Sequence, residues 1–284
     1  MFDIRLENSK GDILEFNKSD SPFVITEVQG LSAPDATINT SANALLDGAK
    51  FNSAKVQMRS IDMIIKIIKN PEANRIILFK VLKSKQFIKF YYKGRYRDVY
   101  IEGYVESMPI NYFDQIQNMT LSILCPSPYF KSAQEMINGM NSVVEMFHFP
   151  FFTAGDAPQP FSYIDTLTII NIENEGDITT GMIIQLYATQ TVVNPKIFNY
   201  ENGEFVGLNF TMQTGDLIEI NTNKGNKKIT LLRNGEYTNI FNTRMRDSVW
   251  LELAYGENIF TMEAKQGINN LRVLFKHFNQ YEGV

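Results

Sequence analysis

Apolar and polar side chains alternate along much of the first 130 residues, the pattern of β-strands that bury one face. Two pairs of alternating runs flank short polar turns and predict hairpins, at residues 2–6 with 12–16 and at residues 87–92 with 95–106. A further strand is predicted over residues 113–124, with Met119, Leu121 and Ile123 on one face. This part of the chain is therefore predicted to be mainly β.

The region between the two hairpins is less regular. Residues 23–29 predict a short strand, and the polar, small-residue stretch 30–44 predicts a long loop of the kind that often carries function. Asp47-Gly48 is a hairpin-type turn dipeptide. The isoleucine-rich residues 54–68 predict a strand or a pair of strands.

One helix is predicted after these strands. Asn70-Pro71 is a helix-start signal, with Asn70 as the N-cap and Pro71 at the first helical position, and the pattern continues to about Ser84. The residues predicted for its buried stripe are Ile76, Phe79 and either Val81 or Leu82.

The second half of the chain consists of short apolar runs separated by turn dipeptides such as Asn202-Gly203 and Asn234-Gly235. Their spacing of about 8–12 residues is typical of a β-sandwich or barrel. The runs span residues 166–172, 182–187, 196–199, 204–208, 217–220, 228–232, 249–253, 258–263 and 271–278. Because residues 131–160 are rich in Pro and Gly, we predict a first domain at 1–135, a linker at 136–160 and a second domain at 161–284.

Composition narrows the possible chemistry. The 284 residues include one cysteine, Cys125, and two histidines, His148 and His277, which excludes an intrachain disulfide and a zinc site with several Cys or His ligands. A lone unpaired cysteine fits synthesis in a reducing cytoplasm. No apolar stretch approaches the roughly 20 residues of a membrane span, and the N-terminus lacks a secretory-signal pattern, so neither is expected.

The net charge of −4 is unevenly distributed. Residues 50–97 hold 13 basic and two acidic side chains, a net +11 interleaved with aromatic residues. A nucleic-acid surface is one interpretation of this basic stretch. The acidic sequence pI near 5.4 argues against it, and a solvated face or a charged interface with an acidic partner remains open.

Candidate catalytic groups are few. Cys125 and His148 are a conceivable nucleophile and base, but nothing nearby in the sequence lowers the thiol pKa, and a small buried residue ending a strand is the plainer interpretation. Glu173, Glu175 and Asp177 cluster in one predicted turn, where acidic side chains usually face solvent. Because the usual phosphate-binding, zinc-protease and esterase motifs are absent, we expect no catalytic, cofactor-binding or metal-binding residues.

The order of these segments resembles the distal tail proteins of long-tailed phages, the siphophage tail-component family, over nearly the whole chain. The most specific segment is Leu124-Cys-Pro-Ser-Pro-Tyr-Phe130, which closes the first domain in that family. Ile170-Asn-Ile-Glu-Asn-Glu-Gly-Asp177 resembles the family's I-x-N-x-G-D turn. Ser248-Val-Trp-Leu-Glu-Leu-Ala-Tyr-Gly-Glu-Asn258 resembles its S-x-W-x-x-L-x-P-G-x-N segment, with Tyr255 in place of the proline.

The resemblance implies a mainly β fold with a small α contribution. An N-terminal belt domain, a split β-barrel with a helix and a hairpin, is followed by a galectin-like β-sandwich. The implied role is a non-enzymatic structural hub of the virion tail tip, made in the host cytoplasm and without a cofactor. Six copies form a ring between the tail-tube protein and the tail-associated fibre or lysin protein, with a receptor-binding protein as a further partner. DNA passes through the lumen without specific binding, and no membrane is involved.

In such a ring, we expect the predicted loop 30–44 and the hairpin 87–106 to lie at or near subunit contacts, because ring closure leaves few free sheet edges. The candidate contact residues are Leu31, Pro34, Lys89, Arg95, Arg97 and Tyr100.

The alternative function is a carbohydrate-binding module for attachment to the host cell surface. Trp250 would then be the sugar contact, although a tryptophan in an alternating strand usually belongs to the core. A glycoside hydrolase using two of the turn carboxylates is a third hypothesis.

Overall fold

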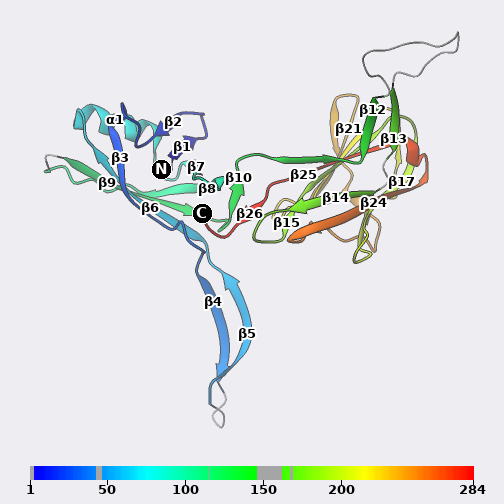
Figure 1. The fold of residues 1–284 in the computed structure, drawn as a ribbon, viewed down its shortest axis with the longest axis horizontal. Coiled ribbons are helices and arrows are strands. Elements are labelled where there is room, and N and C mark those ends of the chain that lie inside the picture. Colours follow the sequence, from blue (N-terminus) through cyan, green and yellow to red (C-terminus); the bar gives the residue numbers. More distant parts are fainter. Residues whose placement is uncertain (1–2, 43–46, 115, 146–161, 167–168) are drawn as a thin grey trace. The chain divides into compact units, whose positions relative to one another are not determined.

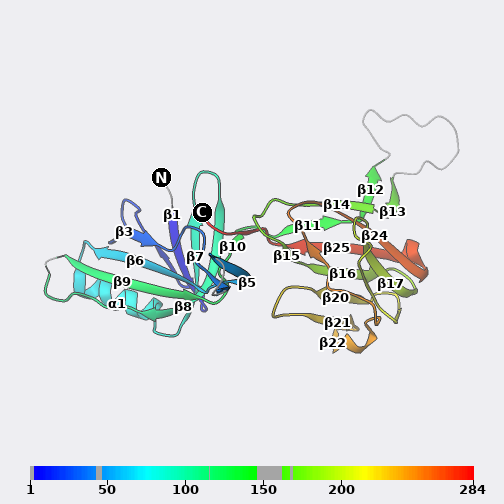
Figure 2. The same cartoon turned by 90° about the horizontal axis from the view of Figure 1, so that it is seen from below.

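The computed structural model describes residues 3–42, 47–114, 116–145, 162–166 and 169–284 (Figures 1 and 2). The chain divides into two compact units, each with its own buried core. Unit 1 comprises Met1–Ala133 together with Gln280–Val284, and unit 2 comprises Gln134–Asn279. The last five residues thus return to unit 1, which the linear division predicted from the sequence does not include.

Unit 1 is built on one large antiparallel sheet with the strand order β2-β1-β7-β8-β9-β6-β3. Two short strands extend it, because β10 pairs with both β8 and the C-terminal β26. The strands are β1 (Asp3–Asn8), β2 (Ile13–Glu15), β3 (Phe23–Gln29), β6 (Arg59–Ile67), β7 (Phe87–Lys93), β8 (Asp98–Ser107), β9 (Gln117–Cys125), β10 (Phe130–Ser132) and β26 (Gln280–Tyr281).

The core of unit 1 follows the period of two that the sequence shows. Alternate residues of β9 are buried, with Met119, Leu121 and Ile123 on one face as predicted. The neighbouring β6 buries Ile61, Met63, Ile65 and Ile67 in the same way. Both predicted hairpins, β1–β2 and β7–β8, are confirmed.

The helix α1 (Pro71–Val81) begins where the sequence predicts and ends three residues before Ser84. Asn70 occupies the N-cap position as predicted, although its backbone is left-handed and its side chain makes no capping hydrogen bond. The predicted buried stripe is wrong. The buried stripe is Leu78, Val81 and Leu82, whereas Ile76 is 48% exposed and Phe79 is 36% exposed. The stripe at i, i+3 and i+4 turns Ile76 and Phe79 away from the core because 3.6 residues complete a turn.

The predicted loop over residues 30–44 is a correction, because most of it is a strand. Here β4 (Ala36–Ala42) pairs with β5 (Ala49–Val56) in a separate two-stranded sheet, with Asp47-Gly48 between them. The small side chains of Ala, Ser and Thr hide the alternation, since they differ little in hydrophobicity. Residues 54–68 are indeed a pair of strands, the end of β5 followed by β6. Residues 43–46 lie outside the described residues.

Unit 2 consists chiefly of two antiparallel sheets that share one core. One sheet has the order β11-β25-β16-β20-β21-β22, and the other has the order β14-β24-β17-β18, with β19 also paired to β17. Phe260 of β24 and Phe275 of β25 stack across the interior with ring centroids 5.3 Å apart. Strand spacing predicted a sandwich or a barrel, and the two separate sheets around one core show that this half is a sandwich.

The strands of unit 2 overlap each run predicted from the sequence, although the run 249–253 contributes only two strand residues. Two short pairs, β12–β13 and β15–β23, lie outside the main sheets. The strands are β11 (Met136–Gly139), β12 (Asn141–Glu145), β13 (Ser162–Thr166), β14 (Ile169–Asn174), β15 (Thr180–Gly181), β16 (Ile183–Ala188), β17 (Val192–Asn199), β18 (Phe205–Gly207), β19 (Thr211–Met212), β20 (Leu217–Asn221), β21 (Lys228–Arg233), β22 (Glu236–Asn239), β23 (Glu252–Leu253), β24 (Gly256–Gln266) and β25 (Leu271–His277). The 3₁₀ turns are η1 (Phe241–Thr243) and η2 (Ile268–Asn270).

Candidate assembly surfaces

The β4–β5 hairpin, which we call the arm, has two chemically different faces. In an antiparallel pair, residues directly opposite each other share a face. One face of the arm is polar and charged, with the pairs Thr37–Lys55, Asn39–Ser53 and Ser41–Lys50. The other face is almost entirely apolar, with the pairs Ala36–Val56, Ile38–Ala54, Thr40–Phe51 and Ala42–Ala49.

The apolar face of the arm is bare in the described chain. Ile38 is 62% exposed and Phe51 is 61% exposed, and every described residue of β4 and β5 except Val56 is exposed. The polar face has its own cross-strand hydrogen bonds, such as Asn39 Nδ2 to Ser53 Oγ at 3.0 Å. A two-stranded hairpin is marginally stable in water by itself. An amphipathic hairpin with an uncovered apolar face is therefore a surface that fits a partner.

The root of the arm is held by a buried arginine that sequence reasoning missed. Arg59, at the start of β6, donates hydrogen bonds to the backbone oxygens of Gly30 and Ser32, to that of Pro128 at 2.7 Å and to that of Glu282 at 2.6 Å. Its guanidinium lies 4.7 Å from the centroid of the Phe130 ring. Burial lowers the pKa of Arg59 from its ordinary value, and the opposing effects of Cys125 and Glu282 are smaller. No local sequence signal identifies this residue, because its acceptors are distant carbonyl groups.

Leu31 and Pro34 lie between the end of β3 and the arm, and both are partly buried. Leu31 packs against the core of unit 1, and its backbone oxygen accepts a hydrogen bond from Val284 N at 3.1 Å. Gly30 has φ +84° there, and an added Cβ would lie 2.0 Å from the oxygen of Ser60. The turn into the arm is therefore tightly defined by backbone geometry and by the C-terminal segment.

The four predicted contact residues on the β7–β8 hairpin occupy different environments. Arg95 is exposed and lies 5.4 Å from the ring centroid of its neighbour Tyr96. Lys89 is partly buried, 5.4 Å from the ring centroid of the buried Tyr100. Arg97 lies 4.5 Å from the Tyr281 ring centroid and donates to the backbone oxygen of Gly283. Arg97 and Tyr100 thus face partners within unit 1, whereas Arg95 faces outward.

The β7–β8 hairpin has no free sheet edge. β7 pairs with β1 and β8, while β8 pairs with β9 and β10 as well. Any contact made by this hairpin with a partner must therefore use side chains rather than backbone pairing. The +11 stretch of residues 50–97 is likewise distributed over the arm, β6, α1 and this hairpin, and one of its cations, Arg59, is buried.

A second bare apolar surface lies at the other end of β6. We call it the tip, and it comprises Ile68, Tyr112, Phe113 and Ile116. Phe113 is completely exposed, and the other three side chains are about half exposed. Because Ile67 pairs with Gln117, Ile68 and Ile116 follow and precede this last registered pair at the same end of the sheet. The sequence predicted a strand from residue 113 and so did not identify an exposed loop here.

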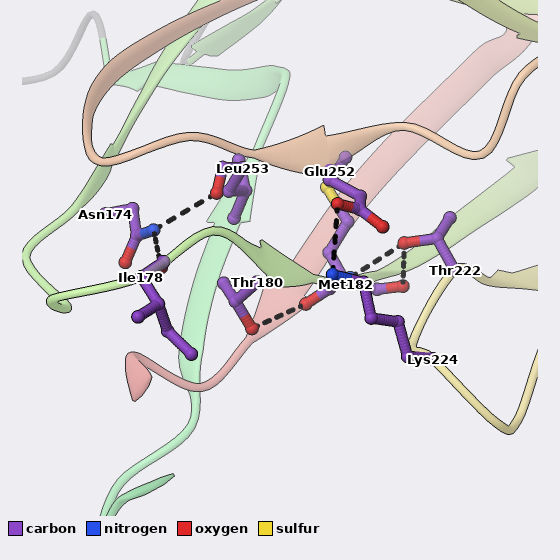
Figure 3. A network of polar contacts seen from close by, with 9 residues as sticks. Asn174, Ile178, Thr180, Met182, Thr222, Lys224, Glu252 and Leu253 are labelled. Atoms are coloured by element: carbon purple, nitrogen blue, oxygen red, sulfur yellow. Dashed lines mark hydrogen bonds and ion pairs between the residues drawn. The ribbon is translucent and has the colours of Figure 1, made fainter. Parts of the chain in front are cut away.

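Two of the three segments that carry the family resemblance meet in unit 2 (Figure 3). Asn174 of the first motif is buried and donates through Nδ2 to the backbone oxygens of Ile178 at 3.0 Å and Leu253 at 3.1 Å. Leu253 belongs to the second motif, in which the buried Asn258 accepts from Ala254 N at 2.8 Å. Ser248 of the same motif accepts from Gly207 N at 2.9 Å. These motif residues satisfy buried backbone groups, so their role is to fix turns.

Met182 and Thr222 extend this network, as Figure 3 shows. Met182 N donates to Thr222 Oγ1 at 2.9 Å, and Thr222 Oγ1 donates to the Met182 oxygen at 3.1 Å. Lys224 forms a solvent-exposed ion pair with Glu252 at 3.8 Å. The network ties β15 and β23 to the neighbouring main sheet and serves the fold of unit 2.

Trp250 is partly buried and packs against the core of unit 2. Its ring lies 5.9 Å from that of Phe241 between centroids, with Lys227 Nζ at 5.6 Å and the Arg244 guanidinium at 5.7 Å. The predicted strand does not reach Trp250, because β23 begins at Glu252, but the ring packs against the core of unit 2 as expected.

The groups considered for catalysis are dispersed. Cys125 is fully buried, and burial raises the pKa of its thiol to about 12, which makes the thiolate scarce at neutral pH. Its proposed partner, His148, lies outside the described residues. Glu173, Glu175 and Asp177 are all exposed. Burial also lowers the pKa of His277, against smaller opposing effects of Asn279 and the Glu173 backbone.

No cluster of three or more His, Cys, Asp or Glu side chains is arranged to hold a metal ion in the described ranges. Among the same residues, no helix has the length and hydropathy that crossing a bilayer requires.

One family model matches most of unit 2. Residues 175–277 match the family model described as "Siphovirus-type tail component, C-terminal domain". This match bears out, over the second half of the chain, the resemblance found in the sequence. No curated protein matches the sequence.

Solved structures extend the likeness to the whole chain. The crystal structure of the SPP1 Dit protein, described as a paradigm of the hub adsorption apparatus in phages that infect Gram-positive bacteria, superposes with a TM-score of 0.69 at 14% identity, covering 98% of this chain and 99% of that chain. The phage P2 baseplate in its activated conformation with Ca matches with a TM-score of 0.57 at 10% identity over the full length of both chains. At these identities the likeness establishes the fold, so the mainly β fold predicted from the sequence is confirmed.

Proposed function

We propose that this protein is a non-enzymatic structural hub of a phage tail tip, in which six copies of unit 1 close a ring. The ring joins the tail-tube protein to the tail-associated fibre or lysin protein, and a receptor-binding protein docks at its periphery. The family match over residues 175–277 and the fold shared with the SPP1 Dit protein support a tail-tip role.

The observation that carries the ring is the bare apolar face of the arm. Ile38 and Phe51 cannot reach a core in their own chain, because the arm forms a separate two-stranded sheet. Burying one such side chain contributes about 1.5–3 kcal/mol. Repeated once per copy in a closed ring, this gain acts at every subunit contact, and closure leaves no arm uncovered.

The chemistry of the described residues supports a role without catalysis. The thiol of Cys125 is buried with a raised pKa, and the acidic turn residues face solvent. The motif residues Asn174, Ser248 and Asn258 hydrogen-bond to backbone groups and fix turns. The lumen of the proposed ring is a passage for DNA, which contacts no base-specific site. The carbohydrate-binding alternative is disfavoured by the packing of Trp250.

Native mass spectrometry of the purified protein tests the ring. The wild-type protein should form a species of six times the 32.6 kDa chain mass. The double variant Ile38→Ser with Phe51→Ser should be monomeric and folded, because it removes only exposed apolar surface from unit 1. The matched control is Tyr200→Ser with Tyr237→Ser, which removes two exposed aromatic side chains from unit 2 and should leave the ring intact. A wild-type protein that stays monomeric at high concentration, with its tail-tube partner present, would refute the proposal.

A further inference from the structure

We infer that the apolar face of the arm packs on the tip of the next copy, so that arm and tip are the two halves of one head-to-tail contact. This inference rests on the proposed ring and names the surface that receives the arm. The partner that covers the arm, and the partner that covers the tip, is in each case another copy of this chain.

The first support is the position of the two surfaces along β6. The arm enters β6 at Arg59, which pairs with Cys125, and the tip begins after Ile67, which pairs with Gln117. A nine-residue strand places these ends about 26 Å apart at roughly 3.3 Å per residue. Figure 1 shows the arm leaving the large sheet at the end of β6 that is remote from α1. Two different surfaces at opposite ends of one strand fit a heterologous contact, the kind that generates rings.

The second support is that the tip is held in shape before any partner binds. Arg75 of α1 donates from Nη1 to Gln117 Oε1 at 3.0 Å, and its guanidinium lies 4.8 Å from the Tyr112 ring centroid. Gln117 in turn donates to the Tyr112 backbone oxygen at 3.3 Å, and Asn111 bonds Asp114 at 2.7 Å. These bonds hold Asn111 and Tyr112 next to the fully exposed Phe113. Backbone that is held before a partner binds loses little conformational entropy on binding.

The third support is that the shapes of the two surfaces are complementary. Four alanines, Ala36, Ala42, Ala49 and Ala54, leave the apolar face of the arm low around its two large side chains, Ile38 and Phe51. A large ring such as that of Phe113 can insert where neighbouring side chains are this small. Aromatic side chains that fill well-packed pockets are common anchors of protein interfaces.

A mixing experiment tests the direction of the contact. Ile38→Ser with Phe51→Ser gives an arm variant whose tip is intact, and Phe113→Ser with Ile116→Ser gives a tip variant whose arm is intact. Each variant alone should be monomeric. An equimolar mixture should form a dimer of twice the chain mass and no larger species, because only one arm–tip contact is available per pair. The control Tyr200→Ser with Tyr237→Ser should assemble like the wild type.

A cysteine pair gives a second measurement that does not depend on variant stability. The native Cys125 is fully buried, so cysteines introduced by Ala54→Cys and Ile116→Cys are the reactive thiols. Oxidation of the double variant should yield covalent ladders up to six chains, whereas either single variant should give far less cross-linking.

The outcomes separate this inference from the proposed function. If the wild type never assembles, the ring itself fails. If the wild type and the tip variant both assemble, the ring stands and the arm–tip contact is wrong. If the arm and tip variants fail to combine in the mixture while the arm variant alone disrupts the ring, the arm has another receiver, such as a second arm, and the inference is overturned.

Discussion

The arm and the β7–β8 hairpin are two antiparallel ribbons of similar length that lie in opposite environments, one exposed and one inside the large sheet. The β7–β8 hairpin carries bulky aromatic residues, and its strands lie inside the large sheet of unit 1 with every edge paired. The arm carries mostly Ala, Ser, Thr and Asn, and stands apart as its own sheet. The ribbon with large apolar side chains is therefore the one that lies in the core sheet, because such side chains gain most free energy from burial. The ribbon with small side chains is the one whose apolar face remains exposed.

The largest effect that separates the two ribbons should come from truncating one phenylalanine in each. Phe90 of β7 is fully buried, so Phe90→Ala should destabilise unit 1 by about 3–5 kcal/mol. Phe51→Ala in the arm should change the stability of the monomer by less than about 0.5 kcal/mol, yet reduce the assembled fraction. Urea denaturation with hydrogen-exchange readout on β7 measures the first effect, and native mass spectrometry the second. Equal losses of stability would show that the arm belongs to the fold rather than to the contact.

A smaller effect is expected at the root of the arm. Gly30→Ala introduces a Cβ that would lie 2.0 Å from the Ser60 oxygen, at φ +84°. The matched control is Gly11→Ala, which has the same φ and nothing within 4 Å of the added Cβ. The control should cost about 1 kcal/mol from backbone strain alone, and Gly30→Ala should cost roughly 1–3 kcal/mol more. Thermal unfolding of unit 1 gives both values. If the two variants were alike, the close approach at the arm root would have no energetic weight.

The smallest effect should come from charge on the β7–β8 hairpin. Arg95→Glu reverses an exposed charge and should alter monomer stability by less than about 0.5 kcal/mol. If the outward face of this hairpin also lies near a neighbour, the variant should weaken assembly at low salt and recover as salt rises. Lys55→Glu, on the polar face of the arm, is the matched control. Indistinguishable assembly of Arg95→Glu and wild type at every ionic strength would leave the hairpin as a core element alone.

The sequence predicted strands well where one side is buried under large side chains. The alternation through Met119, Leu121 and Ile123 identified β9, and Asn70-Pro71 located the start of α1. Prediction from the sequence failed where contacts distant in the chain, or small side chains with little hydrophobic contrast, hide the pattern. The α1 stripe was assigned to Ile76 and Phe79, but the face that reaches the sheet is set by where the helix docks. The period of two in β4 and β5 was overlooked because small residues carry little hydrophobic contrast.

The candidate site divides in the same way. The ring contacts predicted near residue 30 flank the arm, whereas Arg97 and Tyr100 have partners within unit 1. Nothing in the sequence indicated Arg59, whose acceptors lie 27 to 223 residues away along the chain. The sequence also did not indicate that Gln280–Val284 return to unit 1. Pairing between strands so far apart in the chain leaves no periodic pattern in the sequence.

By itself, the sequence determined the mainly β class, the scarcity of reactive groups and the three segments that carry the tail-component resemblance. These follow from side-chain period, residue count and turn chemistry, all of which are local. The tertiary structure decided which apolar surfaces remain uncovered, among them those of the arm and the tip. Exposure is a property of everything that packs around a residue, so an isoleucine in β6 and one in β4 read alike in the sequence and differ completely in the fold.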